Sequence, residues 1–431
     1  MHIHIVAIAG SMTAPLAIAL KKEGHQVTGS DQEKTYPPFS LELKDSKIPI
    51  NTTPVNSKID LAIIGSSYQS FHQTREEYRQ IKSQKIPHIS ATKYISQKLI
   101  KKNSILIAGT YGKTTISAAL AFLLTKANFD PSYMFGGKSL NHLDSLHFSK
   151  SDWSVVEADE SINGCDTKAK FLYYPVKYLI LTSALWEHKD SYQSQSENFS
   201  AFKKLVQNLP QDGCLIYNQD EASILPLLPF AKCQKISYDK TEIANNLIGK
   251  YNQNNLSAVE TLAQIINIDP KYISTSFKEF IGVEKRLEVK SKLNNIIFID
   301  DFAQSSARIK ASLQAIKDTY PLSKIKVLFE AHASFGQYRS NLTELSDAFK
   351  ITNEIVISRL RYCSKIKSQN RLTAKDFLSA ISHSLYVPLS EDIVKHYKNT
   401  LKPGDILVHF SSGGSEGIDV FNQIIRLFNK N

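Results

Sequence analysis

One short segment, Ile105–Thr115, constrains the fold and chemistry of this chain more than any other. Its four apolar leading residues predict a buried strand, and Gly109 and Gly112 predict a sharp turn into a helix over residues 116–126. Backbone N–H groups at a helix N-terminus, with a lysine ammonium (Lys113) and threonine hydroxyls beside them, suit a magnesium-bound polyphosphate. The segment therefore predicts ATP binding.

The glycine spacing of this segment leaves an alternative open. It is Gly-x-x-Gly-Lys-Thr, which is shorter than the full P-loop pattern, so an ordinary strand-to-helix turn with a solvated lysine is the competing interpretation. The order of strand, glycines, Lys-Thr and helix is the order that phosphate binding requires, and it favours the ATP site.

Length and charge limit the class of protein. A chain of 431 residues exceeds one ordinary core, and we expect about three domains. The formal net charge is +11, but the lysines are scattered and no arginine-rich stripe carries interleaved aromatics, so no nucleic-acid partner is predicted. A nucleic-acid ATPase is the least favoured function.

The cysteines and the apolar segments indicate a cytoplasmic protein. The four cysteines include no Cys-x-x-Cys pair, which argues against a zinc site and a disulfide framework. The uncharged stretch 6–20 has no preceding Lys or Arg and is interrupted by Gly10 and Pro15, so it reads as a first strand and turn and not as a signal peptide. No segment is long and apolar enough to span a bilayer, and no stable membrane association is expected.

Strand and helix signals alternate along the whole chain, which predicts α/β units with parallel sheets. We expect three domains in series: a Rossmann-like domain over 1–98, a central P-loop ATPase-like domain over 99–283 and a Rossmann-like domain over 284–431. The predicted strands are 4–9, 26–29, 61–64, 105–108, 153–157, 178–182, 296–300, 326–330, 354–358 and 406–410.

Polar residues follow several of these strands, where parallel sheets bind ligands. Gly10 and Ser11 follow the first strand and suit a phosphate, and Asp31 follows the second and suits a ribose hydroxyl. In the central unit, Glu157 closes a strand and is the preferred magnesium ligand, with a helix N-cap cluster as the alternative. Asp159 and Glu160 are interpreted as a solvated turn.

Taken in order, these motifs resemble those of the Mur ligases, the ATP-dependent amide-forming enzymes of peptidoglycan synthesis. The resemblance covers nearly the whole chain. The motifs that carry it are Gly10-Ser11, Gly29-Ser-Asp31, Gly109–Thr115, Glu157-Ala-Asp-Glu160, Glu187-His188, Gly249-Lys-Tyr-Asn252 with Asn255, Gly282–Arg286 and Asp300-Asp-Phe-Ala303.

The resemblance implies a role for each matching residue. Gly10, Ser11 and Asp31 would face the UDP sugar. Lys113 would hold the β- and γ-phosphates of ATP, within a loop formed by Gly109, Thr110, Gly112, Lys113, Thr114 and Thr115. The implied magnesium ligands are Thr114, Glu157 and His188. The remaining ATP contacts would be Asn252 to the adenine, Arg286 to a phosphate and Asp301 to the ribose.

Two branches of the family fit, and both use UDP-N-acetylmuramate. One branch adds L-alanine, and the other, the murein peptide ligases, adds the recycled tripeptide L-alanyl-γ-D-glutamyl-meso-diaminopimelate. The stretch Asp166–Pro175 resembles the tripeptide branch, in which Lys-Phe-x-x-Tyr follows the acidic motif. We therefore expect the tripeptide ligase, with the L-alanine ligase as the alternative.

Several positions depart from the family pattern. Gln304-Ser-Ser306 stand where His-His-Pro is usual, Tyr251 replaces a histidine, and Ala7 replaces a glycine. Ser183 and Leu185 stand where Asn and Glu are typical. A nucleotide-binding homologue with impaired catalysis is therefore a further alternative.

Overall fold

The computed structural model describes residues 1–32, 35, 39–51, 58–186, 191–239, 242–331, 336–360, 367–411 and 415–429. The chain divides into two compact units, which are considered separately. Unit 1 comprises Met1–Asn246 and Asn252–Val283, and unit 2 comprises Leu247–Tyr251 and Glu284–Asn431. None of the described helices is long and apolar enough to cross a membrane.

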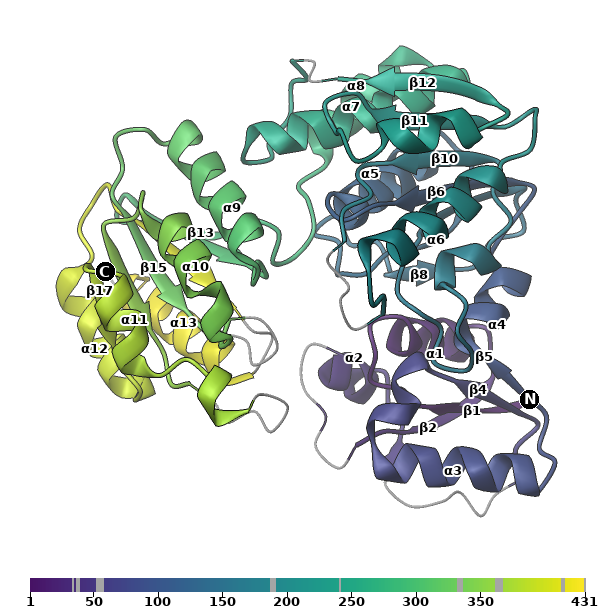
Figure 1. Cartoon of the computed structure of the whole chain (residues 1–431), viewed down its shortest axis with the longest axis horizontal. Helices are drawn as coiled ribbons and strands as arrows, with labels where there is room; N and C mark the ends of the chain where they lie inside the picture. Colours follow the sequence, from purple (N-terminus) through teal and green to yellow (C-terminus); the bar gives the residue numbers. More distant parts are fainter. Residues whose placement is uncertain are drawn as a thin grey trace. The chain divides into compact units, whose positions relative to one another are not determined.

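Unit 1 begins with a parallel sheet whose described strands lie in the order β3-β2-β1-β4-β5 (Figure 1). These strands are β1 (His2–Val6), β2 (Gln26–Ser30), β3 (Ile50–Asn51), β4 (Leu61–Ile64) and β5 (His88–Ser90). The connecting helices are α1 (Thr13–Lys22), α2 (Phe39–Asp45), α3 (His72–Ser83) and α4 (Ala91–Lys98). This is the Rossmann-like arrangement predicted from the sequence.

A second sheet of unit 1 has the order β12-β11-β10-β6-β9-β7-β8, parallel except for the β7–β8 pair. Its described strands are β6 (Asn103–Ala108), β7 (Ser132–Met134), β8 (Leu146–His147), β9 (Trp153–Glu157), β10 (Tyr178–Leu181), β11 (Cys214–Asn218) and β12 (Gln234–Tyr238). The helices that follow are α5 (Lys113–Lys126), α6 (Gln195–Gln207), α7 (Lys250–Ile265) and α8 (Pro270–Glu279). Every residue of α5 from Thr114 to Leu124 is buried, so this helix forms part of the core.

Unit 2 contains a sheet in the order β13-β14-β18-β15-β16-β17, in which only the β13–β14 pair is antiparallel among the described strands. The strands are β13 (Glu288–Leu293), β14 (Ile296–Asp301), β15 (Ile325–Phe329), β16 (Glu354–Ile357), β17 (Ser384–Tyr386) and β18 (Ile406–Phe410). Its helices are α9 (Ser306–Thr319), α10 (Leu342–Phe349), α11 (Ala374–Ala380), α12 (Ser390–Thr400) and α13 (Ser415–Phe428).

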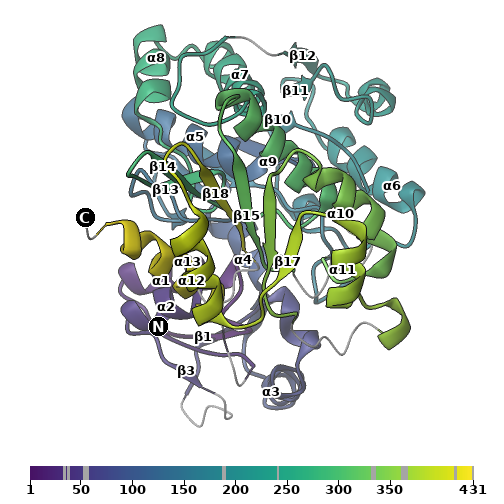
Figure 2. The ribbon, with the colours of Figure 1, turned by 90° about the vertical axis from the view of Figure 1, so that its left-hand side faces the viewer.

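Two apolar clusters cover the two faces of this sheet. Side chains of α9, α10 and α11 pack on one face, and side chains of α12 and α13 pack on the other. Figure 2 shows α12 and α13 on the opposite side of the strands from α10 and α11. Because both faces are covered, the central strands are mostly apolar, as in Ile325–Phe329, where Lys326 is the one charged residue.

The predicted three-part α/β architecture is confirmed, with a local difference at the first strand. The strand was expected over 4–9, but β1 ends at Val6. Ala7 has a φ of 58°, in the left-handed region, and this turns the chain out of the sheet three residues early. The domain limits at 98/99 and 283/284 stay a proposal.

Gly29 provides a test of the packing around the first sheet. A Cβ at this position would lie 2.7 Å from the carbonyl oxygen of Ile5 and would also press on Ile8. We expect Gly29→Ala to lower the free energy of unfolding by about 3 kcal/mol, because a backbone atom cannot move aside cheaply. Urea unfolding measures the change.

Gly24→Ala is the matched control. Gly24 has a φ of +88°, and a Cβ there would meet no atom within 4 Å. This variant should lose only about 1 kcal/mol through backbone strain. Equal unfolding midpoints for Gly29→Ala and the wild type would contradict the described packing.

Candidate functional site

The turn between β6 and α5 is a tight loop at the N-terminus of the helix. Gly109 has a φ of 126° and Gly112 a φ of 76°, conformations that residues with a Cβ rarely adopt. A Cβ on Gly109 would lie 2.7 Å from the Ser183 nitrogen, and a Cβ on Gly112 would collide with the Asn255 amide. The Ser183 hydroxyl accepts a 2.7 Å hydrogen bond from Thr110 N. Ser183 stands where Asn is typical of the family that the sequence resembles, and here the serine helps to hold the loop.

Lys113 is the first residue of α5, and its ammonium lies inside the loop. The Nζ atom donates to the Gly109 carbonyl and lies 3.0 Å from Glu160 Oε2. The Lys113 side chain is 12% exposed and that of Glu160 is 3% exposed. The interpretation of Glu160 as part of a solvated turn was wrong, because this carboxylate is buried as the counter-ion of Lys113.

Thr114 and Glu157 form a pair of oxygen ligands beside the loop. The Thr114 hydroxyl donates to Glu157 Oε1 over 3.0 Å, and Gly136 N donates to Glu157 Oε2 over 2.6 Å. A hydroxyl and a carboxylate are ligands that Mg²⁺ prefers, so these residues fit the ion that the resemblance implies. In the part of the chain that the structure describes, no cluster of three or more His, Cys, Asp or Glu forms a metal site. His188 lies outside the described residues.

The second acid of the motif, Asp159, is partly exposed and also has a basic partner. Lys170 Nζ lies 2.8 Å from Asp159 Oδ2 and 2.7 Å from the Ser161 hydroxyl. Burial alone would raise the pKa of Asp159, but the ammonium groups of Lys170 and Lys113 hold this pKa well below its usual range. Lys170 belongs to the stretch that resembles the tripeptide branch, and its ammonium forms an ion pair with Asp159 of the acidic motif.

Helix α7 places two buried asparagines at the loop. Asn255 Nδ2 donates to Asn252 Oδ1 over 3.0 Å, and the Asn255 amide packs against Gly112. Asn252, the predicted adenine contact, is therefore one side chain away from the loop between β6 and α5. Gly136 and Gly137, which the sequence reasoning missed, also lie here: a Cβ on Gly137 would lie 3.3 Å from the Thr114 methyl group.

The first sheet of unit 1 brings together the residues predicted to face the UDP sugar. Asp31 Oδ2 accepts a 2.7 Å hydrogen bond from Ala9 N, next to Gly10 and Ser11. Burial raises the pKa of Asp31, against the opposing effect of the Ala9 and Gln32 N–H groups. The loop after β1 and the residue after β2 thus form one surface.

Unit 2 places Asp301 and Arg286 near each other. Burial raises the pKa of Asp301, and the Arg286 charge opposes this effect. Asp301 accepts hydrogen bonds from Leu287 N at 3.0 Å and Ala303 N at 2.6 Å, so it organises the start of this unit. Its predicted contact with a ribose stays a prediction.

Two of the three residues in place of His-His-Pro, Gln304 and Ser305, make hydrogen bonds within unit 2. Gln304 Nε2 donates to the Ser411 carbonyl over 2.6 Å, which ties the end of β14 to the end of β18. The Ser305 hydroxyl accepts from Arg308 N and caps α9. Residues 412–414, which follow Ser411, lie outside the described residues.

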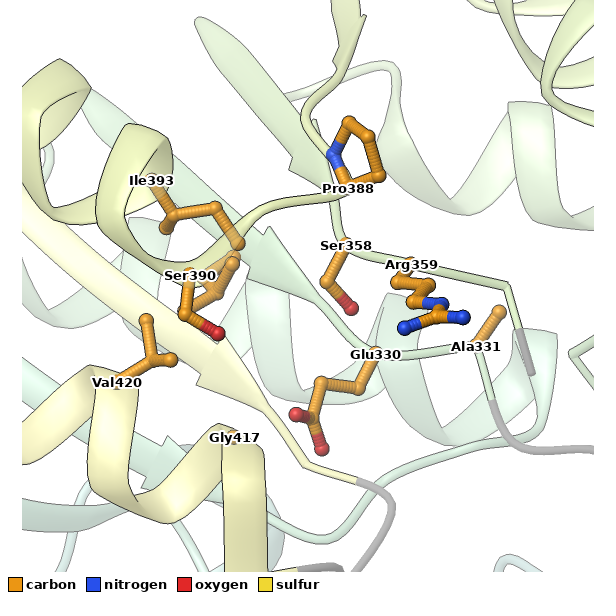
Figure 3. Close-up of a pocket in the computed structure, with 10 residues that line it drawn as sticks. Glu330, Ala331, Ser358, Arg359, Pro388, Ser390, Ile393, Gly417 and Val420 are labelled. Carbon is orange, nitrogen blue, oxygen red and sulfur yellow. The ribbon is translucent and has the colours of Figure 1, made fainter.

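Unit 2 also contains a pocket at the carboxyl ends of β15 and β16 that the sequence reasoning did not predict. Its lining combines Glu330 and Arg359 with apolar side chains such as Ile393. Figure 3 shows the Glu330 carboxylate and the Arg359 guanidinium extending into the same space, with Gly417 beside Glu330. A Cβ on Gly417 would overlap the Glu330 carboxylate, so this glycine leaves room for the acid.

Two family models match the sequence. The Mur ligase family, catalytic domain, matches residues 2–102, and the Mur ligase middle domain matches residues 107–275. Together they span more than half of the chain.

Similar proteins are found over the full length. A UDP-N-acetylmuramate–L-alanine ligase of Desulfitobacterium hafniense is 24% identical and covers 96% of this chain and 97% of its own. The UDP-N-acetylmuramate–L-alanyl-γ-D-glutamyl-meso-2,6-diaminoheptandioate ligase of Escherichia coli is also 24% identical, over 97% of this chain and 96% of its own.

Two solved structures share the fold. The UDP-N-acetylmuramate–alanine ligase of Thermotoga maritima has a TM-score of 0.80 at 21% identity, and it aligns with 100% of this chain over 99% of its own. A murein peptide ligase of Psychrobacter arcticus has a TM-score of 0.70 at 20% identity, with the same coverage of both chains.

Substitutions in the Lys113–Glu160 pair test two roles of the lysine charge. One is its action on the phosphates of ATP, and the other is its contribution to the stability of the fold. We expect Lys113→Ala to lower ATP-dependent phosphate release at least about 100-fold. It should also lower the free energy of unfolding by about 3 kcal/mol, because Glu160 is left buried without its counter-ion. Phosphate release and urea unfolding measure the two effects.

The double variant Lys113→Met/Glu160→Gln should regain most of this stability but none of the turnover. Lys126→Ala is the control, since Lys126 lies on the same helix and its side chain is 48% exposed. Wild-type turnover in the double variant would exclude the proposed role of Lys113.

Glu157 gives an independent test of the magnesium site. Glu157→Gln keeps the size of the side chain but removes its charge, so the Mg²⁺ concentration for half-maximal phosphate release should rise at least about tenfold. The control is Glu279→Gln, because the Glu279 side chain is 46% exposed in the same unit. An unchanged Mg²⁺ dependence in Glu157→Gln would show that the ion binds elsewhere.

Proposed function

Because the chain belongs to the Mur ligase family, whose members are ATP-dependent ligases that form carbon–nitrogen bonds, we propose that it joins the carboxylate of UDP-N-acetylmuramate to the amino group of a peptide. The observation that carries this proposal is the arrangement of Lys113, Thr114 and Glu157 at the glycine loop. These residues supply a cation and two oxygen ligands where a triphosphate meets a helix N-terminus.

The resemblance to the family implies the following chemistry. The muramate carboxylate attacks the γ-phosphorus of ATP, ADP leaves, and an acyl phosphate forms. The amine of the acceptor then attacks the acyl carbon, and the tetrahedral intermediate expels inorganic phosphate as the amine loses a proton. Lys113 and the N–H groups of the loop stabilise charge on the transferring phosphoryl group. Thr114 and Glu157 would hold magnesium, which neutralises phosphate oxygens when it is bound.

The loop after β1 serves the sugar nucleotide in this proposal. Gly10 and Ser11 lie just before the N-terminus of α1, a position that suits the diphosphate, and Asp31 suits a hydroxyl. The Asp31 carboxylate is buried and accepts hydrogen bonds from Ala9 N and Gln32 N, which hold it beside the loop.

We propose the tripeptide L-alanyl-γ-D-glutamyl-meso-diaminopimelate as the acceptor. The support is the stretch Asp166–Pro175, which resembles the tripeptide branch, and the similarity to the Escherichia coli ligase named for this substrate. The pocket of unit 2 adds a chemical argument. Its Glu330 carboxylate and Arg359 guanidinium complement the ammonium and carboxylate at the diaminopimelate end of the peptide.

L-Alanine is the second candidate. The ligase of Desulfitobacterium hafniense is named for L-alanine and that of Thermotoga maritima for alanine, and both resemble this chain over nearly its full length. The replacement of His-His-Pro by Gln304-Ser-Ser306 also keeps a catalytically impaired homologue in consideration.

An acceptor screen distinguishes these possibilities. Phosphate release is measured with ATP, Mg²⁺ and UDP-N-acetylmuramate against L-alanine, a dipeptide, the tripeptide and a tetrapeptide. We expect release with the tripeptide at least about tenfold above that with L-alanine, with the product confirmed by mass spectrometry. Stronger release with L-alanine would identify the alanine-adding activity, and nucleotide binding without release on any acceptor would identify the impaired homologue.

A further inference from the structure

The face of the first sheet that meets α3 carries an unusual row of polar residues. His4 on β1 lies opposite Thr28 on β2 in the parallel register, and Val6 lies opposite Ser30. Side chains two residues apart on a strand share a face, so His4, Thr28 and Ser30 lie along one surface. Parallel strands that are covered by helices are normally apolar on both faces.

These residues form a continuous hydrogen-bonded network with Glu77 of α3. His4 Nε2 lies 2.8 Å from Glu77 Oε1, and His4 Nδ1 lies 2.8 Å from the Thr28 hydroxyl. The Ser30 hydroxyl donates to the other carboxylate oxygen of Glu77. His4 is fully buried and Glu77 is 8% exposed. Apolar residues of the same volume would fill this space without the cost of desolvating an acid.

The network ends at the residues that support the loop after β1. Ser30 is the last residue of β2, and its carbonyl accepts a 2.9 Å hydrogen bond from Ile8 N. The next residue, Asp31, accepts from Ala9 N over 2.7 Å. Two consecutive N–H groups of the loop therefore depend on where the end of β2 is placed.

We propose that Glu77 and His4 are positioning residues for the UDP-sugar site: they fix Ser30, and through Ser30 and Asp31 they set the loop that meets the diphosphate. This inference rests on the proposed function, because it takes Gly10, Ser11 and Asp31 as the sugar-nucleotide surface. It assigns the buried network a role in substrate affinity in addition to any role in folding.

The test measures binding of each substrate separately, by calorimetry on the full chain. Ser30→Ala removes the contact with Glu77 and leaves the His4–Glu77 pair in place. We expect its Kd for UDP-N-acetylmuramate to rise about tenfold, while its Kd for a non-hydrolysable ATP analogue with Mg²⁺ stays within about twofold of the wild type. Glu77→Gln should shift the two constants in the same pattern.

Two further variants serve as controls. Ser30→Thr retains a hydroxyl and should bind the sugar nucleotide more tightly than Ser30→Ala. Glu76→Gln changes the neighbouring acid of α3, whose side chain is 41% exposed, and should leave both constants unchanged. If Glu77→Gln fails to fold, the comparison of Ser30→Ala with Ser30→Thr decides the question.

The outcomes separate this inference from the proposed function. A lower melting temperature in Ser30→Ala with both Kd values unchanged would show a purely structural network and overturn the inference. An equal loss of affinity for both ligands would also overturn it. A wild-type chain that fails to bind UDP-N-acetylmuramate would instead overturn the proposed function on which the inference rests.

Discussion

The ion pair between Lys113 and Glu160 is the interaction around which the candidate site is built. It joins the first residue of α5 to the acidic motif after β9, and both side chains are almost fully buried. Removing one partner of a buried ion pair destabilises the fold, because the other charge is left buried and uncompensated. A triphosphate can offer Lys113 a second anionic partner, and the contact with Glu160 holds the ammonium inside the loop where the phosphates would bind.

The acidic motif assigns a different partner to each of its carboxylates. Glu157 contacts the hydroxyl of Thr114, Asp159 contacts Lys170, and Glu160 contacts Lys113. The parallel pairing of β6 with β9 brings the ends of these strands to one edge of the sheet, where α5 begins. The segment Glu157–Glu160 can therefore contribute to ion binding and also anchor Lys113 and Lys170, because the sheet fixes its position.

The sequence predicted the parts of the site that depend on local order. The strand, the glycines and Lys-Thr predicted the loop, and Glu157 was selected because it closes a strand. The contacts of Asp159 and Glu160 could not be predicted, because no local pattern shows which lysine each carboxylate meets in the folded chain. The early end of β1 at Ala7 was missed for a similar reason, since an apolar run does not show where a left-handed residue leaves the sheet.

The most direct test is a crystal structure of the chain with Mg²⁺ and a non-hydrolysable ATP analogue. The central claim is that one loop grips the triphosphate through Lys113 while Thr114 and Glu157 face the ion. It predicts that Lys113 Nζ contacts the β- and γ-phosphates and that both oxygen ligands lie within magnesium-binding distance. A nucleotide bound away from this loop, with Lys113 still paired only with Glu160, would contradict the claim.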